Sequence, residues 1–363
     1  MERTTRKSIM ISTNKSEGSF RLINTTAGLI LITLIVFILH IGKNLILPLI
    51  IALVIWYIIL QFTGLFHKIK IGRRRLPYAI CLFIAIIVAA AIFYVFILLI
   101  TSSIGNIISE APRYQSKLQL ILSYLNRWTK NRFDAMQLLG KLDLSTFFSK
   151  LAIVISNILS SFTLILIYLL FLLLEANTFD NKLKGMCKTP AQYHRVNNII
   201  GRIHTDINTF LKAKTLINLI AGVASYITLL FFHVDYAEFW GVLIFLLHFI
   251  PFIGPIIAVI FVMLAVSIQI TSLLLFIILG TILIVIQFAV GNILEPKMMG
   301  DRLNLSPIVI LISLAFWGYI WGIIGMFLCV PTMVILTIIF ANFPQTRAIA
   351  VMLSANWHPT HTQ

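Results

Sequence analysis

Apolar runs, each close to the length of a membrane-spanning helix, recur along this chain of 363 residues. A helix rises about 1.5 Å per residue, so about 20 apolar residues cross the roughly 30 Å hydrocarbon layer of a bilayer. The pattern therefore predicts an all-α polytopic membrane protein. The five clearest runs cover residues 22–41, 45–66, 77–100, 151–174 and 213–232.

Composition excludes an ordinary soluble domain. Hydrophobic residues make up 60% of the chain, against roughly 45–50% in soluble proteins. The net charge of +16 could indicate a nucleic-acid partner, but in a membrane protein lysine and arginine mark the cytoplasmic side and attract anionic headgroups. We therefore expect a bilayer with anionic lipids as the partner, and no nucleic acid.

The basic loops predict the orientation of the chain. The N-terminal segment 1–21 is basic, loop 67–76 holds five lysines and arginines, and loop 175–214 holds seven. All three fall on one side if each of the first five runs crosses once. The positive-inside rule makes that side cytoplasmic. We therefore expect a multi-pass protein of the cell inner (plasma) membrane with a cytoplasmic N-terminus and a cytoplasmic tail over 342–363.

Two segments are polar enough to leave the membrane but keep apolar residues at helical spacing. Segment 101–150 is predicted as an external amphipathic helical segment, and 176–212 as a similar stretch on the cytoplasmic side. Segment 101–150 would either lie in the headgroups or form an oligomer contact or lid. A homo-oligomer is one partner that this pattern allows.

Two further apolar stretches are interrupted at their centres. Residues 239–267 carry Pro251, Gly254 and Pro255 in the middle, and each proline removes a backbone donor and clashes with the preceding helical turn. The flanking arms have 12 residues each, so each spans only about 18 Å as a helix. This length predicts a re-entrant helical hairpin, with a kinked single span as the alternative.

The second broken stretch covers residues 305–340 and follows an unbroken apolar helix over about 271–293. Its arms are also short. If 239–267 dips in and returns, Lys297 falls in the cytoplasm, as the positive-inside rule prefers. The two hairpins would then enter from opposite sides, which is a sequence pointer to a transport site at mid-membrane. The residues that interrupt the stretch 305–340 are Gly318, Gly322, Gly325 and Pro331.

These broken stretches carry a family resemblance. The segments FIPFIGPIIA (249–258), NILEPKMMGDRLNLSPIVILISLAFWG (292–318) and WGIIGMFLCVP (321–331) resemble the autoinducer-2 exporter (AI-2E) family of permeases. The resemblance implies an inner-membrane transporter with about eight membrane segments. It implies export of autoinducer-2 for some members and sodium or lithium/proton antiport for others. The chain departs from the family at Leu174-Glu175-Ala176, where a polar or basic residue followed by Asp is usual.

The segments combine into a domain plan. Residues 22–100 hold the first three spans, 151–232 hold the fourth and fifth spans, and 233–341 form a transport core. The residues expected to build the architecture of the site are Pro251, Gly254, Pro255, Pro296, Gly300, Gly318, Gly322, Gly325 and Pro331.

Five polar residues within or beside the core are candidate contacts for a solute or ion, because polar groups inside a membrane are costly. For each there is a structural alternative: Glu295 could cap a turn, His248 could bond a freed carbonyl, and glutamines could link helices. Asp301 and Arg302 could simply pair at the surface. The five candidates are Glu295, Asn292, Gln287, His248 and Gln269.

The functional expectation is a secondary transporter, a permease that exports a small polar solute such as autoinducer-2. The alternatives are a sodium (lithium)/proton antiporter and a non-transporting membrane scaffold. An enzyme is not expected, because the HExxH, GxSxG, GxGD and Walker A patterns are all absent from the sequence. We expect no cofactor and no bound metal, with H⁺ or Na⁺ as the only coupling ion considered.

Overall fold

Helices dominate the structure, which confirms the predicted all-α membrane class. The computed structural model describes residues 26–28, 30–31, 33–68, 70–71, 74–128, 146, 153, 156, 160–176, 178–270, 272–299 and 304–355. Five helical segments are long and apolar enough to cross a membrane, or six if the bent pair α6–α7 counts as one span. The predicted count of about eight membrane segments stays a prediction. The five are Lys43–His67, Tyr78–Leu99, Pro190–Phe231, Leu273–Met299 and Pro307–Ala341.

The first half of the chain forms a small helical unit. It consists of α2 (Lys43–His67), α3 (Tyr78–Trp128) and α6 (Phe162–Glu175), which share a core that includes Ile59 and Ile165. The connection between α2 and α3 contains a two-residue antiparallel pair, β1 (Lys70–Ile71) with β2 (Arg74–Arg75).

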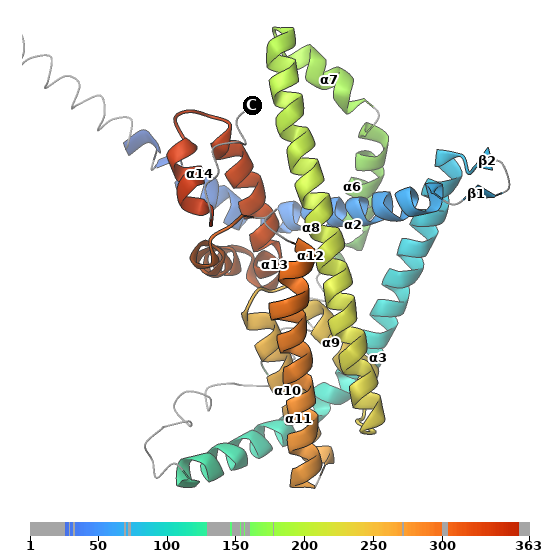
Figure 1. The fold of residues 1–363 in the computed structure, drawn as a ribbon, viewed down its shortest axis with the longest axis vertical. Coiled ribbons are helices and arrows are strands. Elements are labelled where there is room, and N and C mark those ends of the chain that lie inside the picture. The colour runs from blue at the N-terminus through green and yellow to red at the C-terminus, as the bar shows by residue number, and fades with distance from the viewer. Residues whose placement is uncertain are drawn as a thin grey trace, which may run out of the picture.

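Helix α3 continues well past its apolar part and changes direction along its length (Figure 1). The boundary predicted between 100 and 101 therefore falls inside one helix. Its lower portion passes beside α9 (Ala237–Leu247) and α10 (Ile253–Gln269). Most of the remainder of the predicted amphipathic segment, 129–150, lies outside the described residues.

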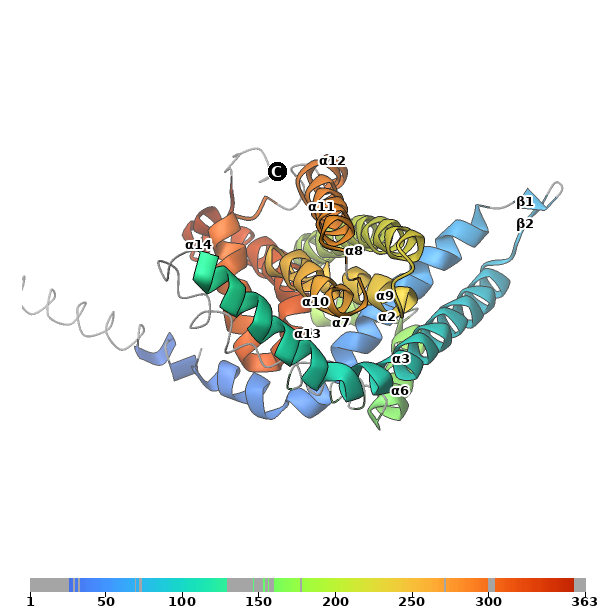
Figure 2. The same cartoon turned by 90° about the horizontal axis from the view of Figure 1, so that it is seen from below.

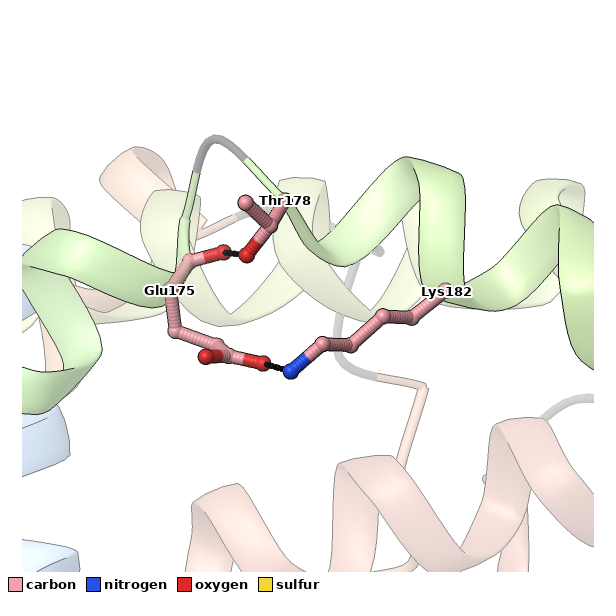
Figure 3. Close-up of polar contacts among 3 residues, drawn as sticks. All are labelled: Glu175, Thr178 and Lys182. Carbon is pink, nitrogen blue, oxygen red and sulfur yellow. Dashed lines mark hydrogen bonds and ion pairs between the residues drawn. The ribbon is translucent and has the colours of Figure 1, made fainter.

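Helix α6 meets α7 (Phe179–Met186) at a bend of 71°. Figure 3 shows how Glu175 lies at this bend, where the Thr178 hydroxyl donates to its carbonyl (3.1 Å) and the Lys182 ammonium pairs with its carboxylate. Both charged side chains are about half exposed, so the ion pair contributes little stability. In this chain Glu175 thus contributes to the exposed connection between α6 and α7.

The second half of the chain forms the larger core. Helix α8 (Pro190–Phe231) runs along most of the molecule in Figure 1 and packs on α9, on α11 (Leu273–Ala289) and on α13 (Pro307–Ala341). Seen from below in Figure 2, α8, α9, α10 and α11 form one bundle. The α8 helix begins at Pro190 after an N-cap at Thr189, whose side chain accepts from the Gln192 N–H. Residues 190–214 of the loop predicted over 175–214 therefore belong to this helix.

The stretch 239–267 folds as two helices joined by a tight turn. Phe252 in this turn has φ of 61°, and a Cβ at Gly254 would lie 1.8 Å from the Leu247 carbonyl oxygen. Only glycine allows the start of α10 to approach the end of α9 so closely. Pro251 lies in the turn itself. The two arms pack against each other as a helical hairpin.

The stretch 305–340 also folds back on itself. Gly322 has φ of 64° and ψ of −142°, which breaks α13 in two. A Cβ at Gly325 would lie 1.9 Å from the Trp317 carbonyl oxygen, and the Ser313 hydroxyl donates to the Cys329 carbonyl (3.3 Å). The pair nearer to Gly322 is Trp317 with Gly325, and the pair farther from it is Ser313 with Cys329. The two arms are therefore antiparallel. Re-entry of either hairpin into a bilayer stays a prediction.

The final helix returns to the start of α13. In α14 (Arg347–Leu353), the Leu353 carbonyl accepts from the Ser306 N–H (2.9 Å). The Asn304 carbonyl accepts from the Ala355 N–H (3.0 Å). These bonds hold part of the predicted tail 342–363 against the entrance of the second hairpin.

Candidate functional site

The two helical hairpins touch within the core. Phe249, in the turn of the first hairpin, stacks on Phe327 in the second arm of α13, with ring centroids 4.2 Å apart and planes inclined by 28°. Helix α8 packs on both hairpins, through α9 and through α13. A stacked aromatic pair adds about 0.5–1.5 kcal/mol beyond burial.

Helix α8 presents a line of buried polar residues toward this contact. Lys214, Asn218 and Ser225 follow one another at i, i+4 and i+11, so they share a face of the helix. Their exposed fractions are 3%, 0% and 0%. Polar groups at such burial are costly unless they are paired, and each of the three has a partner.

Lys214 pairs with Glu295, the first residue of α12 (Glu295–Met299). The distance from Lys214 Nζ to Glu295 Oε1 is 2.6 Å, and the exposed side-chain fractions are 3% and 27%. This ion pair joins α8 to the end of the α11 segment. Taking the two charges out of water is expensive, so the pair is weak evidence for stability and directs attention to function.

A local widening of the helix places Glu295. Between α11 and α12 lies a π-helical turn, η1 (Val290–Leu294), in which the Glu295 N–H donates to the Val290 carbonyl. Pro296 follows; it has no N–H, and its ring would clash with the Asn292 carbonyl in a regular helix. Such π-turns are frequent at functional sites. The sequence Glu-Pro thus fixes both the bulge and the position of the carboxylate.

His248 and Gln287 complete the cluster. His248 Nδ1 lies 3.0 Å from Gln287 Oε1, and Gln287 Nε2 donates to Ser225 Oγ at 3.3 Å. This chain of bonds links the first hairpin, α11 and α8. His248 Nε2 is buried and has no hydrogen-bond partner among the described residues.

Asn218 satisfies the broken backbone of the first hairpin. With the side-chain amide assigned in the orientation that satisfies both of its ends, its nitrogen donates to the Lys214 carbonyl (3.1 Å) and its oxygen accepts from the Phe249 N–H (3.2 Å). A backbone N–H freed by a chain break must find such a partner away from water.

Lys214 lies within electrostatic range of both His248 and Cys329. We call this group the polar cluster; its members are Lys214, Asn218, Ser225, His248, Gln287 and Glu295.

Of the five polar candidates from the sequence, the structure brings three into the polar cluster: His248, Gln287 and Glu295. Asn292 is exposed and donates to the Phe288 carbonyl one turn back. Gln269 lies elsewhere and accepts from the Asp235 N–H at 2.8 Å.

The chain breakers have separate placements. Gly254, Gly322 and Gly325 sit at the hairpin turns, Pro255 lies in the first turn of α10, and Pro331 lies within the second arm of α13. Gly318 faces Met326 across the second hairpin. Gly300, Asp301 and Arg302 lie outside the described residues.

Sequence reasoning missed Lys214, Asn218 and Ser225. Lys214 was grouped with the basic loop 175–214, although it is the first of three polar residues on one face of an apolar helix. That spacing is the signal that could have found them. Within the described residues, no group of three or more His, Cys, Asp or Glu side chains could hold a metal ion. The polar cluster offers hydrogen bonds and one ion pair.

Comparison of the sequence with known proteins identifies its family. The AI-2E family transporter model matches residues 29–345. A candidate transport protein of Haemophilus influenzae is 31% identical over 297 residues, which cover 77% of this chain and 83% of that protein. The AI-2 transport protein TqsA of Escherichia coli K12 is 29% identical over 296 residues, which cover 78% and 83%. These matches confirm the resemblance drawn from the hairpin segments: the chain belongs to the AI-2E family of membrane transport proteins.

Proposed function

We propose that this chain is a secondary transporter that exports a small polar solute, with autoinducer-2 as the first candidate. The observation that carries the proposal is the polar cluster, which lies in an apolar core beside the contact between the two hairpins; all of its members except Glu295 are buried. The similarity to TqsA, whose name states AI-2 transport, supports the choice of first candidate.

The polar cluster and the chain breaks are costly inside a membrane. A buried lysine paired with a partly buried glutamate costs free energy among apolar helices, as do chain breaks whose backbone groups need partners. A passive scaffold gains nothing from these features. A transporter uses them, because a polar solute needs hydrogen bonds inside the membrane and discontinuous helices can rearrange around it.

The distribution of charged segments supports an inner-membrane orientation. In Figure 1, α7, the start of α8 and α14 lie toward one end of the molecule, and the junction of α8 with α9 lies toward the other. The first end carries the basic segments that the positive-inside rule places in the cytoplasm. We propose cytoplasmic termini on this ground, with anionic lipids meeting the basic segments.

Glu295 is the residue on which an antiporter would depend, since it is the carboxylate in the polar cluster. In the structure its charge is already compensated by Lys214 at 2.6 Å. A cation would have to displace this ammonium. The geometry therefore favours the transport of a solute that adds no charge.

The test is a flux assay in proteoliposomes that contain the full chain. Vesicles loaded with autoinducer-2 should lose it faster than protein-free vesicles. The same vesicles are assayed for sodium movement under an imposed pH gradient. Sodium movement without autoinducer-2 movement would support the antiporter, and no movement of either would favour the scaffold.

A further inference from the structure

We infer that the polar cluster is a hydrogen-bonding site for an uncharged molecule that bears hydroxyl groups. One hydroxyl donates to His248 Nε2, and oxygen atoms of the same molecule accept from Lys214 Nζ. The inference rests on the proposed function only in treating this molecule as the transported solute.

The acceptor side of the site is His248. Its side chain is 1% exposed, and its Nε2 has no partner among the described residues. Its other nitrogen, Nδ1, faces the carbonyl oxygen Oε1 of Gln287, while the Gln287 amide nitrogen is directed to Ser225. With the Gln287 amide assigned in this orientation, Nδ1 carries the proton and donates. In an uncharged imidazole the remaining nitrogen, Nε2, is an acceptor that requires a donor.

The donor side of the site is Lys214. An ammonium has three N–H donors, and the bond described for this one goes to Glu295 Oε1. The side chain is 3% exposed, so the other two donors are also away from bulk water. Buried donors without acceptors are costly. Lys214 can therefore bind the oxygen atoms of a ligand without giving up Glu295.

The charge balance selects the class of ligand. Lys214 and Glu295 cancel each other, so the site has no net charge to compensate a buried ion. A carboxylate ligand would face Glu295, and an ammonium ligand would face Lys214. A hydroxyl group is both a donor and an acceptor, so a molecule with several hydroxyl groups can supply the donor that His248 needs and the acceptors that Lys214 needs. Three elements contribute: the turn after α9, helix α8 and helix α12.

Binding is measured on the full-length protein in lipid nanodiscs, where no flux is required. The probes are four-carbon molecules of matched size: erythritol, which is an uncharged tetrol, succinate, which is an anion, and 1,4-diaminobutane, which is a cation. We expect erythritol to bind at least about tenfold more tightly than either charged probe, a difference of about 1.4 kcal/mol. Failure of erythritol to bind, as when a buried water alone satisfies these groups, overturns the inference.

Two histidine variants test the assigned atom. Glutamine reaches the position of Nε2, whereas asparagine reaches only that of Nδ1. His248→Asn should weaken erythritol binding about tenfold, and His248→Gln should restore most of it. The control is His194→Gln, at an exposed histidine of α8. Equal affinity of wild type and His248→Asn would contradict the assignment. The probe series on the wild-type protein remains decisive if a variant does not fold.

This experiment separates two failures. If autoinducer-2 crosses the proteoliposome membrane but erythritol does not bind, the hydroxyl site is wrong and the transport proposal stands. If erythritol binds with the expected dependence on His248 but no solute crosses, the site stands and the proposed function is wrong.

Discussion

Replacing Glu295 by leucine leaves the Lys214 ammonium buried without its counter-charge. Lys214 is 3% exposed, while Glu295 is 27% exposed. Removal of one partner from a buried ion pair costs about 3–5 kcal/mol, because the remaining charge is uncompensated. We expect Glu295→Leu to lose an amount in this range from the free energy of unfolding.

The reverse change should cost less. Lys214→Met leaves a carboxylate that is less completely buried than the ammonium, so we expect a loss of about 1–3 kcal/mol. The double variant removes both charges and replaces them with apolar groups of similar size. It should lie within about 1 kcal/mol of the wild type, or be more stable. The two losses are therefore strongly non-additive.

The assay is a double-mutant cycle on the full chain, with reversible unfolding by sodium dodecyl sulfate in mixed micelles. The cycle should give a coupling energy of at least about 2 kcal/mol between the two residues. A coupling energy below about 0.5 kcal/mol, or a larger loss for Lys214→Met than for Glu295→Leu, would refute the buried-pair reasoning.

Three other predictions follow from particular contacts. Gly325→Ala should destabilise the protein by more than about 2 kcal/mol, because its Cβ would meet the Trp317 carbonyl at 1.9 Å; Gly64→Ala, at an open helical position, should change unfolding by less than about 1 kcal/mol. Hydrogen bonds from Lys184 and then from Tyr193 hold the pKa of Asp180 below its ordinary value. This contact therefore stabilises the folded protein at pH values above the unfolded-state pKa of about 3.9, and the stabilisation is lost as the pH falls through the lower pKa of the folded state. Tyr193→Phe should raise that pKa in a carboxyl ¹³C NMR titration, and an unchanged pKa would exclude the hydroxyl as a cause. A cysteine in place of Lys297 should react with an impermeant thiol reagent only from the cytoplasmic side, and external labelling would overturn the orientation.

Much of the helical architecture could be predicted from the sequence, because the length and hydropathy of an apolar run determine whether a helix can span a bilayer. The helices α2 and α11 lie close to the predicted runs 45–66 and 271–293. The ends of α3 and α8 could not be predicted in this way. Helix α3 continues past Gly105 and Pro112 into polar sequence, and the first half of α8 is polar. Hydropathy marks the edge of the apolar layer rather than the end of a helix.

The positions of the chain breaks were predicted better than their geometry. Four candidate breakers in 305–340 gave no ground for choosing one, and the structure turns at Gly322, where φ is positive. Pro331 lies inside a helical arm instead. The choice depends on which glycine lets the arms approach, and Gly325 does so against Trp317. That is a tertiary contact, which no local pattern contains.

The partners within the polar cluster could not be predicted from the sequence either. His248, Gln287 and Glu295 were singled out as polar residues within or beside apolar segments, but their partners on α8 were not. Lys214 is separated from Glu295 by 81 positions, so the pairing depends on how the helices pack. Asn292 and Gln269 matched the same sequence criterion and form local bonds instead.

Two glutamines give the most direct test of the polar cluster as the transport site. Gln287 joins His248 to Ser225 in the cluster, whereas Gln269 bonds the Asp235 N–H outside it. Each is replaced by leucine, and the initial rate of autoinducer-2 efflux is measured in proteoliposomes at equal protein content. The account predicts that Gln287→Leu lowers the rate about tenfold or more and that Gln269→Leu stays within about twofold of wild type. A normal rate for Gln287→Leu, or an equal loss in both variants, would contradict it.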